Sequence, residues 1–195
     1  NESTVIEAAK DYLNQRNGRL LLLQQEGKRI IHFRLKRFSL AFDPNRIFAE
    51  SGRTVTLKQY SKSYIAAAEK ILAAFAEKLL SYLKDAKIVV ALHNNTEGGS
   101  LSIKTFPEKY RYVNPEMDAD DFILTTEKNI FDQLKAKKIN VVLETAANTP
   151  DDGSLSIYCS KNKIPYINVE AQQGHKKEQL RMLNALTDII AQYGN

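Results

Sequence analysis

The sequence predicts an α/β fold, a three-layer sandwich in which helices cover both faces of a mainly parallel, mixed sheet. The first observation behind this prediction is that runs typical of strands alternate along the chain with helical patterns. The second is the run KIVVALH over 87–93, which is too apolar for an edge strand, so we expect it at the centre of the sheet. The third is size, because 195 residues, 43% of them hydrophobic, suit one domain. With no repeat or linker in the sequence, we expect residues 1–195 to form a single domain.

The first half of the chain predicts two helices separated by extended segments. The expected elements are a helix over 4–17, strands over 19–25, 29–36 and 37–42, a loop over 43–48 and a helix over 57–84. Ser3 or Thr4 is a suitable N-cap for the first helix, and Gly18 is a suitable stop. The helix over 57–84 is the strongest prediction, because it contains many alanines and leucines but no glycine or proline.

The second half predicts the alternation of strands and helices that defines the fold class. The expected elements are strands over 87–93, 121–126, 139–145 and 165–171, and helices over 127–138 and 176–193. In sheets of this kind, functional residues gather where the strands end. The polar residues that follow these strands are therefore the first candidates for a functional site.

Composition and charge exclude several classes of protein. The net charge of +5 comes from lysines and arginines scattered among acidic residues, and no basic stripe with interleaved aromatic residues points to nucleic acid. The longest apolar stretches are too short to span a bilayer. The single cysteine, Cys159, excludes an internal disulfide framework and a cysteine-rich metal site. Because the first residue is Asn1 rather than methionine, we expect a processed or truncated chain, and the compartment (cytoplasmic, or periplasmic or secreted after loss of a leader) and oligomeric state stay open.

Two polar side chains directly follow apolar strands. His93 ends the run 87–93 and is followed by the glycine-containing loop NNTEGGS. Glu170 stands near the end of PYINVEA and precedes AQQGH. A carboxylate buried in such a place is costly unless it is paired or ligated. For each residue taken alone, a solvated strand end is the alternative.

Two further segments carry candidate site residues. Asn45 and Arg46 are adjacent in the proline-bent loop DPNRIF, where an amide and a planar guanidinium can face a carboxylate. Glu2 directly precedes the first predicted helix, where a carboxylate is also favoured simply by the helix dipole. An Asx-capped turn with a surface arginine is the structural alternative for the loop.

The order of these segments resembles a known family. NE-S-T precedes a helix and is followed by D-P-N-R-x-F, then by L-H-N-N-T after a strand, then by V-E-x-x-x-G after another. This is similar to the aspartoacylase and succinylglutamate desuccinylase branch of the zinc carboxypeptidase-like hydrolases. That branch has H-G-N-E-x-T, D-L-N-R-x-F, L-H-N-T-T and V-E-x-G-P-Q-x-x-G in the same order. The resemblance covers the chain from Glu2 to the last helix.

The resemblance implies a zinc site with Glu2 and His93 as ligands. A third ligand, a histidine three positions before Glu2, falls before Asn1. The first strand of the domain and this first-ligand segment would therefore both precede Asn1. Zinc with three protein ligands leaves one position for water and lowers the pKa of that water towards about 7. The resemblance makes Glu170 the general base that takes the proton of the metal-bound water and passes it to the leaving nitrogen.

The resemblance also implies a substrate that bears a carboxylate. Asn45 and Arg46 would bind that carboxylate, and an upstream arginine would polarise the scissile carbonyl. Spacing leaves both Arg29 and Arg37 open for the second role. Of the remaining histidines, we expect His175 at the mouth of the site or on the surface, and His32 on a sheet face.

Departures from the family pattern change the expected substrate. The chain ends without the small C-terminal β domain that covers the site in aspartoacylase-like proteins, which favours a more open cleft and larger substrates such as peptides. Proline in DPNR and the sequence VEAQQGH in place of V-E-x-G-P-Q are further departures. The sequence therefore predicts a zinc-dependent hydrolase that cleaves an amide or peptide bond next to a carboxylate in a small molecule or peptide. A cell-wall amidase and a non-catalytic binding domain of the same fold are the alternatives.

Overall fold

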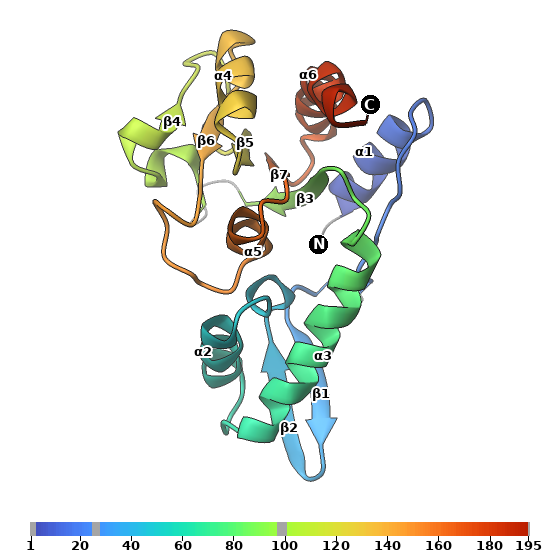
Figure 1. Cartoon of the computed structure of the whole chain (residues 1–195), viewed down its shortest axis with the longest axis vertical. Coiled ribbons are helices and arrows are strands. Elements are labelled where there is room, and N and C mark those ends of the chain that lie inside the picture. Colours follow the sequence, from blue (N-terminus) through green and yellow to red (C-terminus); the bar gives the residue numbers. More distant parts are fainter. Residues whose placement is uncertain (1–2, 25–27, 97–100, 195) are drawn as a thin grey trace.

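The computed structural model describes residues 3–24, 28–96 and 101–194 as an α/β fold built around a mixed five-stranded sheet (Figure 1). The strands lie in the order β3 (Val89–Asn95), β7 (Tyr166–Gln172), β5 (Phe122–Thr125), β6 (Val141–Leu143) and β4 (Arg111–Tyr112). β3 runs parallel to β7, and β5 runs parallel to β6. The pairings of β7 with β5 and of β6 with β4 are antiparallel.

Helices cover both faces of this sheet, so the arrangement is that of a three-layer sandwich (Figure 1). One face packs against α1 (Ser3–Leu13), α4 (Lys128–Ala136) and α6 (Lys176–Gly194) in one buried cluster. The other face packs against α5 (Leu155–Lys161) and the short helix η2 (Ile103–Thr105). Successive residues of a strand point to opposite faces, which is why both faces of these apolar strands need a cover.

The registers show which residues belong to each face. Ile123 pairs with Val169 and Val141, and all three lie in the cluster under α1, α4 and α6. Leu124 pairs with Val142 and lies in the cluster under α5. Burial of these side chains supplies the main driving force for the layers, at roughly 25 cal/mol per Å² of apolar surface.

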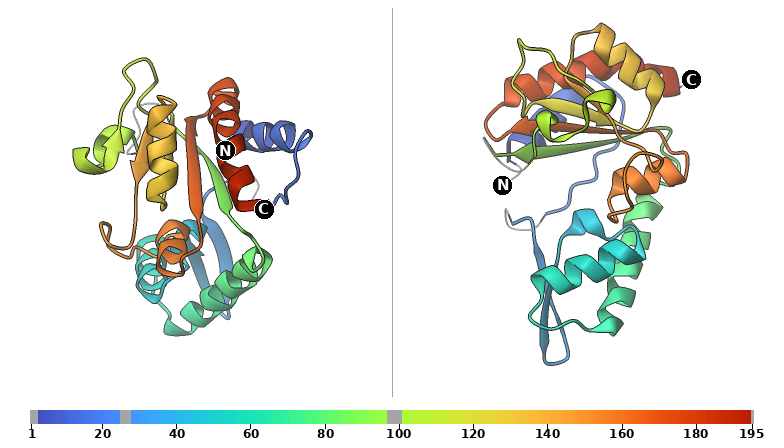
Figure 2. Two further views of the ribbon diagram at one scale, coloured as in Figure 1. Left: turned by 45° about the horizontal axis from the view of Figure 1, so that its top comes forward. Right: turned by 90° about the vertical axis from the view of Figure 1, so that its left-hand side faces the viewer.

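The segment between α1 and β3 forms a second packed unit. β1 (Ile31–Leu35) and β2 (Phe38–Phe42) form an antiparallel hairpin that packs with α2 (Glu50–Tyr60) and α3 (Ala66–Leu83). Its core contains Leu40, Ile47, Leu57 and Leu72, each almost fully buried. Figures 1 and 2 show this unit beside the sheet, with the short helix η1 (Pro44–Arg46) on the side nearer the sheet. A further short helix, η3 (Glu108–Tyr110), precedes β4.

Two expectations about the sheet need correction. The sheet is mixed, as expected, but its parallel pairings do not outnumber its antiparallel ones. Within the described residues, β3 lies at the end of the sheet rather than at its centre, although its sequence is the apolar run 87–93. Contacts with α1 and β7 leave most of β3 half-buried, which accounts for its apolar composition at this position.

Two expected elements also differ. The leucine-rich run predicted as a strand has no regular structure over 19–24. Leu20, Leu21 and Leu23 are exposed, so the apolar side chains of this run are not buried by pairing with another strand. The expected helix over 57–84 is broken at Ser61, whose hydroxyl bonds the backbone N–H and C=O of Ala41 on β2. Helix α5 was not expected, and the expected turn at Glu26-Gly27 lies outside the described residues.

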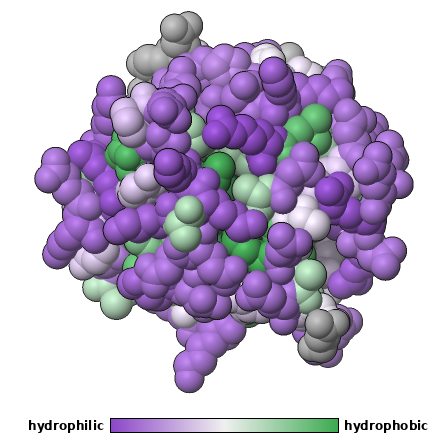
Figure 3. Space-filling view, turned by 90° about the horizontal axis from the view of Figure 1, so that it is seen from above, coloured by the Kyte–Doolittle hydropathy of each residue, from purple (hydrophilic) through white to green (hydrophobic). Residues whose placement is uncertain are grey.

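The surface agrees with the scattered charge of the sequence. The face seen in Figure 3 is mostly hydrophilic, with small apolar patches between polar side chains. In the part of the chain that the structure describes, every helix is too short or too polar to cross a bilayer.

Candidate functional site

His93 and Glu170 are in-register neighbours at the carboxyl ends of the parallel strands β3 and β7. In-register residues of adjacent strands point to the same face, and the strands are about 4.8 Å apart. The side chain of Glu170 is buried, with the residue 5% exposed, whereas His93 is half-buried. The two residues that the sequence singled out separately therefore belong to one place in the fold.

The carboxylate of Glu170 is held by an amide from its own strand. Asn168 lies two residues earlier on the same face of β7, and its Nδ2 donates to Glu170 Oε1 at 2.8 Å. The Oδ1 atoms of Asn168 and of Asn95 are buried and have no hydrogen-bond partner among the described residues. Asn95 and Asn168 lie two residues from His93 and Glu170, respectively, on the same strands, so their side chains are on the same face of the sheet.

The first turn of α1 is bound to the same strand ends. The backbone N–H of Val5 donates to Asn94 Oδ1 at 3.3 Å, and Asn94 Nδ2 donates to the carbonyl of Ala171 at 3.3 Å. Thr4 Oγ1 accepts from the backbone N–H of Gly174 at 2.9 Å. Three of the four motif segments thus meet where β3 and β7 end. The predicted ligand Glu2 lies outside the described residues.

The DPNR segment is ordered by Asp43. Its side chain caps η1 by accepting from the backbone N–H of Asn45 at 2.9 Å. Its other oxygen receives two bonds from Arg29, at 3.0 Å from Nε and 2.7 Å from Nη2. The backbone N–H of Asp43 donates to the buried Thr56 Oγ1 at 2.7 Å. The Asx-capped turn, which was the structural alternative to a substrate-binding loop, is therefore present. Its Asp43 also bonds Arg29 and so connects Arg29 to the loop that carries Arg46.

Arg29 also lies within electrostatic reach of the predicted base. Burial alone would lower the pKa of the Arg29 guanidinium, but the hydrogen bond to Asp43 and the charges of Asp43 and Glu170 leave the pKa raised above its ordinary value. Arg37, by contrast, lies in the turn of the β1–β2 hairpin, with its guanidinium 5.2 Å from the ring centroid of Phe38. The structure thus groups Arg29, and not Arg37, with the other site residues.

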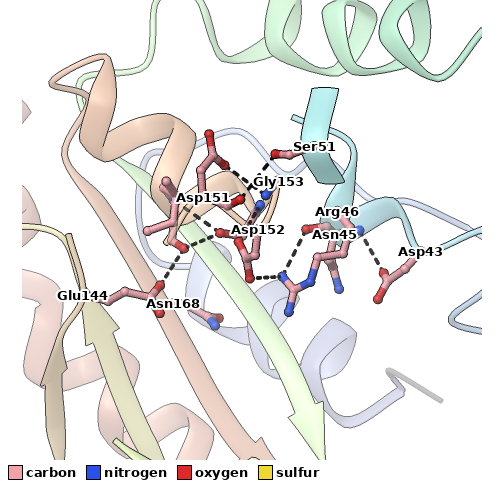
Figure 4. A network of polar contacts seen from close by, with 12 residues as sticks. Asp43, Asn45, Arg46, Ser51, Glu144, Asp151, Asp152, Gly153 and Asn168 are labelled. Carbon is pink, nitrogen blue, oxygen red and sulfur yellow. Dashed lines mark hydrogen bonds and ion pairs between the residues drawn. The ribbon is translucent and has the colours of Figure 1, made fainter. Parts of the chain in front are cut away.

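Arg46 meets an acidic residue that the sequence analysis did not single out. Its Nη1 lies 3.2 Å from Asp152 Oδ2 and 3.3 Å from the carbonyl oxygen of Asn45. Figure 4 shows the chain of contacts that runs from Asp43 through Asn45 and Arg46 to Asp152. The guanidinium that the sequence assigned to a substrate carboxylate is therefore paired with a carboxylate of the protein.

A polar relay continues from Asp152 to a buried carboxylate. Asp152 Oδ1 accepts from the backbone N–H of Ser154, whose hydroxyl lies 3.0 Å from that of Ser156. Ser156 donates to Glu144 Oε2 at 2.7 Å (Figure 4). Burial raises the pKa of Glu144, and the hydrogen bond from Ser156 opposes this effect. Burial also raises the pKa of Tyr166 well above its ordinary value, and the nearby positive charge of Arg46 opposes that shift.

Two glycines fix the loop of Asp152 against the loop of Arg46. A Cβ atom added to Gly52 would lie 2.4 Å from the carbonyl oxygen of Arg46 and 2.6 Å from the Cα of Gly153. Gly153 has a φ of +79°, which favours glycine, and its carbonyl accepts from the backbone N–H of Phe48 at 3.0 Å. Only residues without a Cβ allow this approach, so the two glycines set the geometry of the Arg46–Asp152 pair.

The two remaining histidines lie apart from this loop. His32 is exposed on β1, as its prediction as a sheet-face residue requires. His175 precedes α6, and its Nδ1 lies 3.0 Å from Oδ2 of the fully buried Asp121. Desolvation alone would lower the pKa of His175, but the bond to Asp121 and the charge of Asp121 leave it raised. Burial likewise raises the pKa of Asp121, against the hydrogen bonds from Gln172 and His175.

Sequence reasoning missed Asn168, Asp152 and Asp121. The run DDGS does carry a local signal, since aspartates before a glycine favour an Asx turn and a serine favours a helix N-cap. Both features are present, with Ser154 capping α5. The contact with Arg46 joins two distant parts of the chain, and no local pattern predicts it.

Comparison of the chain with protein-family models, with curated proteins and with solved structures gives no match. Within the described ranges, no three histidine, cysteine, aspartate or glutamate side chains are grouped so that they could hold a metal ion. Of the ligands expected from the motif order, His93 is the one that the structure describes. The candidate site is therefore defined by its own geometry, that is, by His93, Glu170, Arg29 and the Arg46 loop.

Proposed function

We propose that the chain is a zinc-dependent hydrolase of the carboxypeptidase-like kind, which cleaves an amide or peptide bond in a substrate that bears a carboxylate. The observation that carries the proposal is the register of His93 with Glu170 beside the first turn of α1. An imidazole and a buried carboxylate at the carboxyl ends of two neighbouring strands are the parts that metal-assisted hydrolysis needs. The zinc carboxypeptidase-like fold is part of the same proposal, supported by the three layers and the motif order.

The proposed zinc ligands are His93 and Glu2. Imidazole nitrogen and carboxylate oxygen are ordinary zinc ligands. The described turn of α1 that follows Glu2 is bonded to Asn94 at the end of the strand that carries His93, although the side chain of Asn94 points to the opposite face of the sheet. The unpaired amide oxygens of Asn95 and Asn168 are also compatible with positive charge near His93. When bound, zinc would make a coordinated water acidic enough to act as a nucleophile near neutral pH.

Glu170 is the proposed general base. It takes a proton from the attacking water and later delivers it to the leaving nitrogen. The bond from Asn168 fixes one of its oxygens and so orients the carboxylate. A base on a strand keeps its position better than a base on a loop.

The arginines are proposed to act on the substrate. Arg29, oriented by its two bonds to Asp43, would stabilise the negative charge that develops on the carbonyl oxygen. Arg46 and Asn45 would bind the substrate carboxylate, since a guanidinium offers two parallel donors. A small molecule or a peptide can satisfy these contacts.

Hydrolysis of matched substrates tests the proposal. We expect the zinc-loaded protein to hydrolyse acylated amino acids, isopeptides or short peptides that bear a free carboxylate, and to hydrolyse the corresponding carboxamides at least about tenfold more slowly, because they lack the charge that Arg46 binds. Binding without turnover would support a non-catalytic domain of the same fold. Equal cleavage of acids and carboxamides would support a cell-wall amidase, which needs no carboxylate clamp. Either result would overturn the proposed function.

A further inference from the structure

We propose that Arg46 and Asp152 together recognise a zwitterionic head group, in which a carboxylate and a free ammonium stand on the same carbon. This inference rests on the proposed function and names its substrate class. It explains why the predicted carboxylate-binding arginine faces a fixed carboxylate of the protein.

The ion pair is open to an incoming ligand. The side chains of Arg46 and Asp152 are 40% and 45% exposed, respectively. The contacts of the Arg46 guanidinium with described residues run through Nη1, so its Nε and Nη2 remain as donors for a second carboxylate. Such an exposed pair contributes little to stability, so a ligand can replace the contact between the two side chains at small cost while both stay in place.

The carboxylate of Asp152, however, cannot simply move away. Its Oδ1 accepts from the backbone N–H of Ser154 at 3.0 Å. The turn that carries it is held by the contact of Gly52 with Gly153 and by the bond from Phe48 N–H to the carbonyl of Gly153. A substrate therefore meets a positive and a negative group at fixed positions.

This arrangement discriminates between head groups. A ligand with a carboxylate alone would gain the Arg46 donors but place its negative charge beside Asp152, and like charges at such short range repel. A ligand that also carries an ammonium satisfies both groups at once. Asp152 thus converts a general carboxylate clamp into a site selective for an amino-acid head.

The chemistry of the substrate follows from a free ammonium. An amino acid whose α-nitrogen is acylated has no ammonium beside its carboxylate, so the scissile nitrogen must be a different one. The favoured substrates are amino acids acylated on a side-chain nitrogen, or isopeptides, whose α-amino and α-carboxyl groups are both free. The head would occupy Arg46 and Asp152 while the amide reaches Glu170.

Three related compounds test the inference by binding. Nε-acetyl-L-lysine has both head charges, Nα,Nε-diacetyl-L-lysine has only the carboxylate, and Nε-acetyl-L-lysinamide has only the ammonium. Calorimetric titrations would use the wild type, Asp152→Asn, and Asp151→Asn as the matched control. Asp151 lies in the same turn and carries the same charge, but it pairs with Lys161 at 2.6 Å instead of with Arg46.

We expect the wild type and Asp151→Asn to bind Nε-acetyl-L-lysine about tenfold more tightly than the diacetyl compound. Asp152→Asn should weaken the first compound, strengthen the second and so abolish the preference, while the amide of asparagine still accepts from Ser154. An unchanged preference in Asp152→Asn, an equal effect of Asp151→Asn, or no preference in the wild type would overturn the inference.

The same compounds separate this inference from the proposed function. A wild-type preference for the zwitterionic head without any hydrolysis refutes the hydrolase but keeps the head-group site. Hydrolysis of carboxylate-bearing amides without that preference keeps the hydrolase and refutes the head-group site.

Discussion

Glu170 on β7 stands in register with His93 on β3, and Asn168 Nδ2 donates to the Glu170 carboxylate at 2.8 Å. The pairing brings together two residues from distant parts of the sequence. It places a buried carboxylate next to a half-buried imidazole at the carboxyl ends of two neighbouring strands.

Replacing Glu170 by glutamine tests the general base. In Glu170→Gln the new side chain keeps an oxygen that accepts from Asn168, so the fold and the zinc content should be unchanged while the proton acceptor is lost. We expect kcat to fall by about 10²–10⁴. Steady-state rates at equal zinc content measure this effect. Activity equal to that of the wild type would remove Glu170 from the mechanism.

Arg29 and Arg37 can be distinguished by parallel substitutions. Arg29→Gln removes the guanidinium that bonds Asp43 and lies within electrostatic reach of Glu170, so we expect kcat to fall by about 10²–10³. Arg37→Gln changes a residue in the hairpin turn and should leave kcat within about twofold, as is usual for an exposed side chain. Measuring kcat of both variants on the same substrate distinguishes the two arginines. A larger loss of kcat in Arg37→Gln than in Arg29→Gln would show that Arg37, and not Arg29, polarises the scissile carbonyl.

The glycine contact predicts a stability effect linked to the Arg46 loop. Gly52→Ala forces a Cβ into the carbonyl of Arg46 and the backbone of Gly153, so we expect a loss of about 1–3 kcal/mol in the free energy of unfolding and a raised KM. Gly194→Ala is the control, because its added Cβ meets no atom within 4 Å. Urea titrations of both variants measure the difference. Equal stability of Gly52→Ala and the wild type would show that the two loops are not in close contact.

The pair of His175 and Asp121 predicts a pH dependence of stability. The folded protein raises the pKa of both groups, so it binds more protons than the unfolded chain and the pair stabilises it less as pH rises. The contribution of His175 should be fully present below its unfolded pKa of about 6.5 and disappear as pH rises through its folded pKa. His175→Gln should therefore cost about 1 kcal/mol at pH 5.5 and much less above the folded pKa, since the exposed imidazole is partly screened. Urea titrations across this pH range measure it, and a constant difference would contradict the protonated pair.

The sequence predicted the elements of the sheet better than their arrangement. The strands over 121–126 and 165–171 were found because short apolar runs bounded by polar residues are typical of buried strands. Their antiparallel pairing depends on contacts across the whole domain, which no local pattern contains. The run expected as a strand over 19–25 shows the converse. Its composition suggested a strand, but its described residues, 19–24, pair with no other strand.

The site shows the same division. His93, Glu170 and Arg46 were found because a polar residue after an apolar strand, or in a proline-bent loop, stands out locally. Asp152 was not found, because the same sequence, DDGS, is expected whether the aspartate is simply solvated in a turn or pairs with Arg46. Arg29 was separated from Arg37 only when the structure placed Asp43 beside it.

Zinc stoichiometry of the full-length protein, purified without chelators, tests the central claim most directly. With His93 and Glu2 as ligands, we expect about one zinc per chain in the wild type and in Glu170→Gln, and a loss of most of the zinc in His93→Ala, because removing a protein ligand weakens binding sharply. His32→Ala, which changes an exposed histidine of β1, is the matched control and should retain zinc. A wild-type protein that holds no stoichiometric zinc, even after zinc is added back, or a His93→Ala variant that keeps it, would contradict the account.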